Sequence, residues 1–469
     1  MSEASRIGRW LTLVGVTGLL ALASFSSPGA GRAISAPDPF RETFVTFFPI
    51  YEMTRLRFNA IDDAANPRRT ELHRFNHLRR LLDHTSRAVS TPNNDTLYSS
   101  ARLDLRAGPV LVEVPAMPGR YHSLQLIDAH TENAAIVRGG VGASGSSAPT
   151  RLWVVGPGAN AAVPPHAQGE QMVKVATHDV WLLVRVLVDG QADIAAVAAL
   201  QQAMRITAPQ PAAAYPPVKS APPKDPTPEQ FLATVNEALE RNPPEGALAE
   251  QVRSLAAAGL GGAGWSGLDA AARQRWLQDW PTLTALLRQP LSALSRSVAG
   301  WEYPPPELGR WSGNTLLRAT VALQGIGALE ASEALYLSTS LDSRGQPLMG
   351  ERRYRVVVPA GGLPVREQGF WSLTMYEVQP DGRLFLAANP IGRYSVGDRT
   401  RGLVRAADGS LALTLQRTAP TESVAAANWL PTPAGPFRLM LRAYLPTEAL
   451  AAGGAALPRV EPVPDSAPD

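Results

Sequence analysis

The chain contains no cysteine among its 469 residues. It can therefore form no disulfide, bind no zinc through thiolates, carry no lipid on an N-terminal cysteine and use no cysteine nucleophile. If the chain is exported, its stability has to come from packed cores alone.

A strong excess of charge is also lacking. The 44 basic residues barely outnumber the 41 acidic ones, lysine is scarce beside arginine, and no dense basic run occurs. We therefore expect no nucleic-acid partner. The hydrophobic content of 45% is that of a globular protein, and the length predicts two or three domains. The 42 prolines and 39 glycines imply many turns, which favours a mostly β scaffold.

Only the N-terminus contains an extended apolar run. Arg6 and Arg9 precede an uncharged stretch over residues 10–25, and small residues at 31–33 and 34–36 offer cleavage sites. The stretch is shorter than the ~20 residues of a spanning helix. We predict that residues 1–36 are a signal peptide or an N-terminal anchor. The expected location is periplasmic or secreted, with anchoring by this segment as the alternative and no integral membrane domain beyond it.

The spacing of apolar residues changes along the rest of the chain. Helical spacing over residues 37–84 includes His73 and His77, which stand four apart on the predicted helix. That spacing suits a metal site, but arginines crowd the segment and no glutamate lies between the histidines, so we predict no metal there. Short alternating runs between turns then extend to about residue 187 and indicate a β-sandwich.

Five segments follow from these changes. We predict an N-terminal domain over 37–207 (a helical lead-in, then a β-sandwich), a proline-rich linker over 208–226, a helical segment over 227–338, a C-terminal jelly-roll-like sandwich over 339–449 and a loose tail over 450–469. Thr227 to Gln230 read as a helix start with a capping box. Residues 259–264 match the letters GxGxxG but follow a helical run, which predicts a helix-ending loop and no nucleotide cofactor. We expect no cofactor at all.

The most informative stretch is residues 92–99, with the sequence PNNDTLYS. Asn, Asp and Thr side chains bond neighbouring backbone, so this stretch predicts an ordered turn followed by a strand. One interpretation is a turn that satisfies only its own backbone. The other is a polar pocket for a ligand, with Asp95 as a candidate catalytic carboxylate. For that pocket we predict the lining residues Asn93, Asn94, Asp95, Tyr98, Arg120 and Tyr121.

A second set of candidates lies in the C-terminal half. These residues combine aromatic rings with planar hydrogen-bonding groups, as sites for sugars and other flat polar ligands do: Trp371, Tyr376, Asn389, Arg393, Tyr394, Asn428 and Trp429. The alternative is that they pack the domain rim and satisfy loops.

The same motifs carry a family resemblance. PNNDTLYS at 92–99, FWSLTMY at 370–376, NWLP at 428–431 and LRAYLP at 441–446 resemble the paired "domain of unknown function" proteins DUF1254 and DUF1214. The resemblance implies an immunoglobulin-like N-terminal sandwich, a helical insert and a C-terminal jelly roll, and it implies no reaction. Arg102 stands where that family usually has tryptophan, and His122 where it usually has an aromatic residue.

Three classes of function remain open: an exported enzyme, a ligand-binding protein and a scaffold. We predict an exported envelope protein that binds or processes a small organic ligand or glycan fragment in a polar and aromatic cleft. The alternative is a non-enzymatic binding or assembly protein of the envelope. Whether the protein is an enzyme is left open by the sequence.

The N-terminal segment gives a first testable prediction. We expect residues from Met1 to about Ala33 to be absent from the mature protein, because a short apolar run preceded by arginines and followed by small residues is typical of a cleaved signal. Intact-mass measurement of protein purified from the envelope of its own host checks this. A full-length mass would support an anchor instead.

Overall fold

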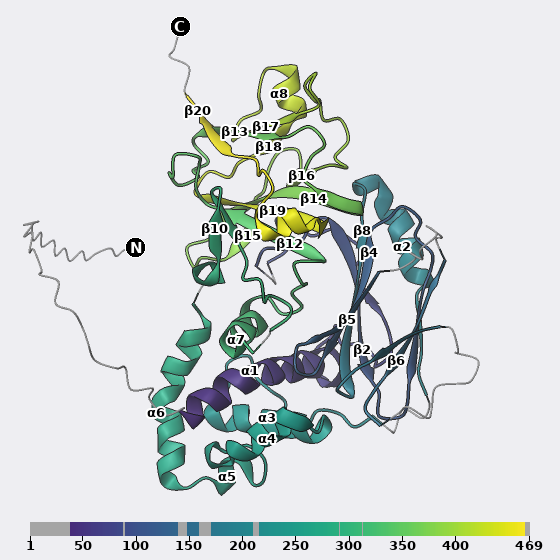
Figure 1. The fold of residues 1–469 in the computed structure, drawn as a ribbon, viewed down its shortest axis with the longest axis vertical. Coiled ribbons are helices and arrows are strands. Elements are labelled where there is room, and N and C mark those ends of the chain that lie inside the picture. Colours follow the sequence, from purple (N-terminus) through teal and green to yellow (C-terminus); the bar gives the residue numbers. More distant parts are fainter. Residues whose placement is uncertain are drawn as a thin grey trace, which may run out of the picture. The chain divides into compact units, whose positions relative to one another are not determined.

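A computed structural model describes residues 38–87, 90–138, 148–158, 170–209, 215–289, 291–311 and 313–464. The predicted signal segment therefore lies outside the described residues. The described chain from Pro39 onward belongs to one compact unit, Pro39–Asp469 (Figure 1). None of its described helices combines the length and apolar character that crossing a membrane requires.

The N-terminal domain is a sandwich of two sheets. Sheet A has the strand order β1-β2-β8-β4-β5 and sheet B the order β7-β6-β3-β9. The strands are β1 (Asn76–His77), β2 (Thr96–Asp104), β3 (Val110–Val114), β4 (His122–Asp128), β5 (Asn133–Arg138), β6 (Thr150–Val155), β7 (Gln171–Lys174), β8 (Asp179–Leu187) and β9 (Arg205–Thr207). Leu97, Val112, Leu124 and Val184 belong to one buried core that both sheets enclose. The predicted sandwich is confirmed.

Sheet A has a second covered face. Alternation along β2 sends Leu97, Ala101 and Leu103 into the sandwich core, so Tyr98 and Arg102 lie on the opposite face. Polar side chains on that outer face form hydrogen bonds with residues from the middle segment of the chain. Arg185 on β8, for example, donates to the Gly327 carbonyl over 3.1 Å.

The helical segment packs around α1 (Pro39–Arg57), which contacts α3, α6 and α7 (Figure 1). Aromatic rings fill this core: the Phe44 ring lies 5.4 Å from Phe231 and 5.1 Å from Trp280, centroid to centroid. The helices of the chain are η1 (Phe58–Asp62), η3 (Gln191–Asp193), α2 (Ile194–Ala203), α3 (Pro228–Arg241), α4 (Gly246–Ser254), η5 (Ala256–Ala258), α5 (Gly264–Gly267), α6 (Ala270–Leu287), η6 (Leu291–Leu294), α7 (Thr315–Gln324), α8 (Ser423–Ala427) and α9 (Glu448–Ala452).

Local signals in this segment are confirmed. Thr227 caps α3 with the full capping box, since its hydroxyl accepts from the Gln230 amide and the Gln230 side chain accepts from the Thr227 amide. Gly259 ends η5 with φ at 98°, a left-handed conformation that glycine adopts without steric cost. Residues 259–264 are thus a helix-ending loop, as predicted.

The C-terminal domain is also a sandwich. Sheet C has the order β10-β11-β12-β19-β14-β15, with β16 paired to β14, and sheet D has the order β18-β17-β13-β20. The strands are β10 (Arg296–Val298), β11 (Trp301–Tyr303), β12 (Ala334–Thr339), β13 (Arg353–Val358), β14 (Val365–Val378), β15 (Leu384–Leu386), β16 (Ser395–Gly397), β17 (Leu411–Gln416), β18 (Trp429–Pro431), β19 (Phe437–Pro446) and β20 (Val460–Val463). Leu373, Leu413 and Leu441 lie in their shared core, which makes the domain the expected jelly-roll-like sandwich.

The predicted helix around residues 72–82 is wrong. His73 has φ at 58° and its amide donates to the Arg102 carbonyl, while His77 belongs to β1 and pairs with Ser99 on β2. Pairing along the edge of β2 overrides the helical spacing, because a left-handed backbone at His73 interrupts any right-handed helix. The two histidines therefore share no helix face, and the His77 ring bonds the Ser99 hydroxyl over 2.8 Å.

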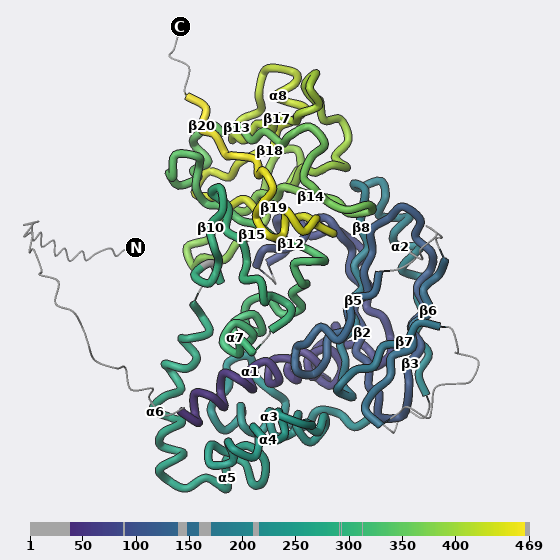
Figure 2. Tube along the Cα trace, in the orientation of Figure 1, coloured from purple at the N-terminus to yellow at the C-terminus, as the bar shows by residue number. Residues whose placement is uncertain are grey.

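Two other boundaries need correction. The predicted helical segment contains the strands β10 and β11, because Trp301 and Tyr303 bury their rings in the C-terminal core. The predicted loose tail contains α9 and β20, and β20 pairs with β13, beside which Figure 2 places it.

Because the tail is ordered, substitutions at two valines of β20 should change the free energy of unfolding by different amounts. Val460 is 4% exposed in the C-terminal core and Val463 is 39% exposed. Val460→Asp should lower the free energy of unfolding by several kcal/mol, because a carboxylate would be buried unpaired. Val463→Asp, the matched control, should change it by less than about 0.5 kcal/mol. Chemical denaturation measures both, and equal losses would contradict the packing of β20.

Candidate functional site

The turn at residues 92–95 lies against sheet C. The Asn93 side-chain amide donates to the Tyr444 hydroxyl over 2.7 Å, and the Ser372 hydroxyl donates to an Asp95 carboxylate oxygen over 2.8 Å. The same Asn93 side chain also accepts the Asp95 amide over 2.7 Å. The turn thus satisfies part of its own backbone, as one interpretation proposed, and uses its remaining groups to join the two β domains.

Arg442 on β19 completes this junction. Its guanidinium donates to the Thr374 hydroxyl over 2.8 Å, to the Thr91 carbonyl over 3.3 Å and to the Tyr376 hydroxyl. Tyr376 in turn donates to the Pro92 carbonyl over 2.8 Å. Arg442 is only 1% exposed, and its Nε atom has no hydrogen-bond partner among the described residues.

Asp95 sits in an environment of opposing effects. Burial raises the pKa of its carboxyl, while the nearby charge of Arg442, the hydrogen bond from Ser372 and the charge of Arg399 act to lower it. The net direction is upward, so the carboxyl retains its proton to a higher pH than an ordinary aspartate does. Burial likewise raises the pKa of Tyr376 to about 12.

The outer face of sheet A carries two pairs of aromatic and cationic side chains. Tyr98 and Arg102 on β2 stand directly opposite Arg185 and Trp181 on β8. The Arg185 guanidinium lies 5.4 Å from the Tyr98 ring centroid, and that of Arg102 lies 4.4 Å from the Trp181 centroid. Between them the Trp181 indole nitrogen donates to the Ser100 hydroxyl over 2.8 Å. Tyr98, Ser100 and Trp181 are only half-buried, so this row stays partly open.

Sheet C contributes tyrosines to the same region. The Tyr336 and Tyr444 hydroxyls bond each other over 2.9 Å, and Tyr336 is half-buried. Burial acts to lower the pKa of the Arg185 guanidinium, but the phenol groups of Tyr98, Tyr336, Tyr121 and Tyr444 outweigh it and the net direction is upward. Tyr98 from one domain and Tyr336 from the other therefore both raise the pKa of the Arg185 guanidinium.

Arg120 and Tyr121 are neighbours in sequence but point to different partners. The Tyr121 hydroxyl donates to a Glu333 carboxylate oxygen over 2.6 Å, which brings Tyr121 to the junction. Arg120 instead forms a two-pronged pair with Asp193, one bond of which is 2.9 Å long. The structure therefore places Arg120 on the sandwich beside η3.

Asn94 and Tyr394 fix the chain that leads into the turn. The Asn94 side chain donates to the Leu82 carbonyl, and the Tyr394 hydroxyl bonds the His84 ring over 2.7 Å. Both contacts tie residues 82–84 in place. Neither side chain contributes a described hydrogen bond to Asp95 or to the aromatic row.

The remaining candidates bond within the C-terminal domain. Trp371 is 2% exposed and belongs to its hydrophobic core. Asn389 accepts the Arg393 amide over 3.0 Å, and the Arg393 guanidinium donates to the Trp429 carbonyl over 2.9 Å. Asn428 donates to the Ala412 carbonyl over 3.0 Å. The polar residues among these bond backbone and side chains within the domain, whereas Tyr376 lies at the junction with Asp95.

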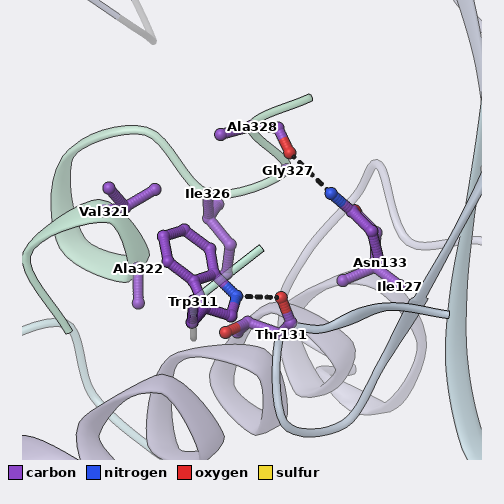
Figure 3. Close-up of a pocket in the computed structure, with 9 residues that line it drawn as sticks. All are labelled: Ile127, Thr131, Asn133, Trp311, Val321, Ala322, Ile326, Gly327 and Ala328. Carbon is purple, nitrogen blue, oxygen red and sulfur yellow. Dashed lines mark hydrogen bonds between the residues drawn. The ribbon is translucent and has the colours of Figure 1, made fainter. Parts of the chain in front are cut away.

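The cavities near these residues are small. One of them, of about 10 Å³, is lined by Trp311, Thr131 and Asn133, among others. That volume is about one water's. Figure 3 shows these residues: the Trp311 indole nitrogen donates to the Thr131 carbonyl over 3.0 Å, and Asn133 donates to the Ala328 carbonyl over 3.1 Å. A second cavity, of about 20 Å³, lies beside Arg57, Arg102 and Asp179. Among the described residues no cluster of histidine and acidic side chains suits a metal ion.

A buried charge cluster borders this second cavity. Asp179 accepts from Arg241 over 2.9 Å, from Arg106 over 3.1 Å and from Arg57 over 3.3 Å. Burial acts to raise the pKa of Asp179, but these three arginines outweigh it and hold the pKa well below its usual range. The cluster locks α1 and α3 onto the outer face of sheet A.

Two family models match the chain. The family model described as "Protein of unknown function (DUF1254)" matches residues 72–208, and "Protein of unknown function (DUF1214)" matches residues 333–448. The chain belongs to the paired DUF1254 and DUF1214 family. The DUF1254 region thus supplies Asn93 and Asp95 to the junction, and the DUF1214 region supplies Ser372 and Tyr444.

One solved structure shows the same fold, and a second is more distantly similar. The VPA0106 protein from Vibrio parahaemolyticus is 23% identical, with a TM-score of 0.66 over 91% of this chain and 99% of that one. An uncharacterised protein from Burkholderia cenocepacia is 15% identical, with a TM-score of 0.40 over 92% of this chain and 91% of that one. No curated protein matches the chain.

Sequence reasoning missed several residues of this region. Trp181 and Arg185 lie in a run from Val180 to Val188 that reads as a buried strand, and Tyr336 lies in what was predicted to be helix. The signal that could have identified Arg185 is its position as a lone arginine within an apolar strand, because a buried arginine requires partners.

The raised pKa of Asp95 predicts a pH-dependent effect of Asp95→Asn. A carboxyl whose pKa is higher in the folded than in the unfolded state stabilises the protein fully at low pH, and this contribution is lost as the pH rises through the folded-state value. The amide resembles the protonated carboxyl. The variant should therefore lose least stability, relative to the natural protein, at neutral and higher pH. Thermal unfolding between about pH 4 and pH 8 measures the trend.

Ser372→Ala tests the same hydrogen bond from sheet C. It removes a described donor from a buried carboxyl and should lower the free energy of unfolding by about 1–3 kcal/mol. Ser343→Ala, at an exposed serine, is the control and should change it by less than about 0.5 kcal/mol. Equal losses in the two serine variants, or an Asp95→Asn deficit that grows with pH, would count against this account of the junction.

Proposed function

We propose that the protein binds a small organic ligand or glycan fragment on the outer face of sheet A, beside the junction with sheet C. The observation that carries this proposal is that Tyr98 and Trp181 remain half-buried while each lies next to a buried arginine. Other parts of this face are covered by the helical segment and the C-terminal domain. A partly open aromatic row on such a face is typical of a ligand site.

The chemistry of the row suits a ligand with a flat face and polar edges. Tyr98 and Trp181 offer rings for stacking, and the Arg102 guanidinium, which has no described hydrogen-bond partner, offers a planar set of donors. No hydrogen bond of the Tyr98 hydroxyl occurs among the described residues, so this group is available to a ligand. Sugars and small aromatic molecules both meet these requirements.

Binding is better supported than catalysis. Asp95 is 8% exposed and its carboxylate already accepts from Ser372, whereas glycoside hydrolysis uses a pair of accessible carboxyl groups. A carboxyl of raised pKa would nevertheless suit a general acid, which is the observation in favour of processing. A scaffold role has less support, because exposed large side chains such as Met172, Leu277 and Ile391 lie on separate elements.

We further propose that the protein acts in the cell envelope or outside the cell. The support comes from residues 1–36, whose two arginines, short apolar run and small residues are typical of an export signal. A ligand site for small organic molecules or glycan fragments suits this location.

Calorimetric titration with a panel of small ligands tests the site. The panel pairs glucose with glucuronate and benzyl alcohol with benzoate, so that both ring types are present with and without a carboxylate. For whichever ring type binds, Trp181→Leu should weaken binding about 2- to 12-fold through lost stacking. Tyr98→Phe should weaken it by a similar factor through one lost hydrogen bond.

Two tyrosine variants serve as controls. Tyr215→Phe removes a hydroxyl that donates to the Pro209 carbonyl and to no residue of the row, and it should leave affinity unchanged. Tyr394→Phe reports on the second predicted group in the C-terminal domain. If Tyr394→Phe weakens binding while Tyr98→Phe and Trp181→Leu do not, the ligand site lies in the C-terminal loops and the proposed site is wrong.

A further inference from the structure

The aromatic row ends at the cavity of about 20 Å³. Arg102 belongs to both, since it lies over the Trp181 ring and also lines the cavity. Arg57 lines the cavity from the end of α1. The cavity and the proposed ligand face therefore share one residue, Arg102.

Arg102 is a buried cation without a hydrogen-bonding partner for its charged group. It is 8% exposed, and no hydrogen bond of its guanidinium occurs among the described residues. Burial, assisted by the charge of Arg57, lowers the pKa of Arg102 to about 9. The charge of Asp179 acts in the opposite direction but does not outweigh these two effects.

Arg57 has a free donor on the same side. The residue is 4% exposed, and its Nη2 atom is buried without a hydrogen-bond partner among the described residues. The Asp104 carboxylate is 3.6 Å from that atom, too far for a good hydrogen bond. The other guanidinium nitrogens of Arg57 bond Asp62 and Asp179.

Two arginines beside the cavity keep donors that no described group accepts. The cluster contains Arg57, Arg102, Arg106 and Arg241, together with the carboxyl groups of Asp62, Asp104 and Asp179, and Glu237 acts on Arg241. Arg106 and Arg241 bond Asp179, whereas Nη2 of Arg57 and the guanidinium of Arg102 have no described hydrogen-bond partner. These donors belong to residues that line an unfilled space.

Two lining groups restrict what the space accepts. The Thr54 hydroxyl donates to the Ile50 carbonyl over 2.8 Å, so it has no proton for an anion. Asp179 also lines the cavity, but three arginines already share its charge. A volume of about 20 Å³ holds about one or two water-sized atoms, which suits the two oxygens of a carboxylate.

We infer that the ligand carries a carboxylate, and that this carboxylate occupies the cavity between Arg57 and Arg102. The inference rests on the proposed function for the identity of the rest of the ligand. Arg102 then has two roles: its guanidinium plane packs on Trp181 and its edge binds the carboxylate. Arg57 supplies the second donor through Nη2. The acid therefore enters with its ring along the aromatic row and its charged end in the cavity.

The test uses acetate as the smallest probe and the acid and neutral pairs of the ligand panel. Acetate should raise the melting temperature saturably, relative to a HEPES background of the same ionic strength. Glucuronate or benzoate should bind about 10-fold or more tightly than its neutral partner, the factor expected of one charge-assisted hydrogen bond. Arg102→Met should abolish both effects, and Arg102→Lys, which keeps the charge, should retain part of them.

Arg74→Met is the matched control, since Arg74 is 71% exposed and pairs with Glu71 on the surface. It should respond to acetate as the natural protein does. The inference is overturned if acetate stabilises Arg102→Met as strongly as the natural protein, or if neutral and acid partners bind equally and independently of Arg102. That second result leaves the proposed function standing. If no panel member binds, the proposed function fails, and the acetate response of the Arg102→Met and Arg102→Lys variants still decides whether the cavity is an anion site.

Discussion

The buried polar junction between the turn at residues 92–95 and sheet C is the constraint on which the rest of the structure depends. A buried amide or carboxyl without a partner costs more free energy than a satisfied one contributes. Asn93 needs the Tyr444 hydroxyl and Asp95 needs Ser372, and each of these partners lies in the other β domain. The two domains therefore specify one mutual arrangement through hydrogen bonds, in addition to packed rings such as Tyr121, Phe370 and Tyr444.

That arrangement changes what sheet A can do. A sandwich sheet ordinarily has one face in the core and the other in water. Here the outer face meets the helical segment, through contacts such as the one from Arg185 to Gly327, and its polar residues become the wall of an interior region. The cluster around Asp179 fixes the other end of the same face, because Arg57 and Arg241 bring α1 and α3 onto it. Between these two fixed ends, Tyr98, Ser100 and Trp181 keep part of their surface.

Much of the fold could be predicted because its signals are local. The short alternating runs expected up to about residue 187 include strands such as β2, since alternation with period two records which side of a sheet is buried. The capping box at Thr227 is as local, because its two hydrogen bonds span three residues. The helical spacing over residues 72–82 gave a wrong prediction. Residues 76–77 pair with the edge of β2 instead, and the spacing of a segment does not record whether a partner strand lies beside it.

The candidate site divides in the same way. The sequence by itself determined that residues 92–95 form a polar turn before a strand, and that Tyr98 and Arg102 share a face of that strand, because both follow from side-chain chemistry and backbone period. Only the tertiary structure decided that Ser372, 277 residues along the chain, bonds Asp95, and that Trp181 lies opposite Arg102. It also decided that the polar face is covered. Strand pairing and domain contact join residues far apart in sequence, and no local periodicity records which distant partner a side chain meets.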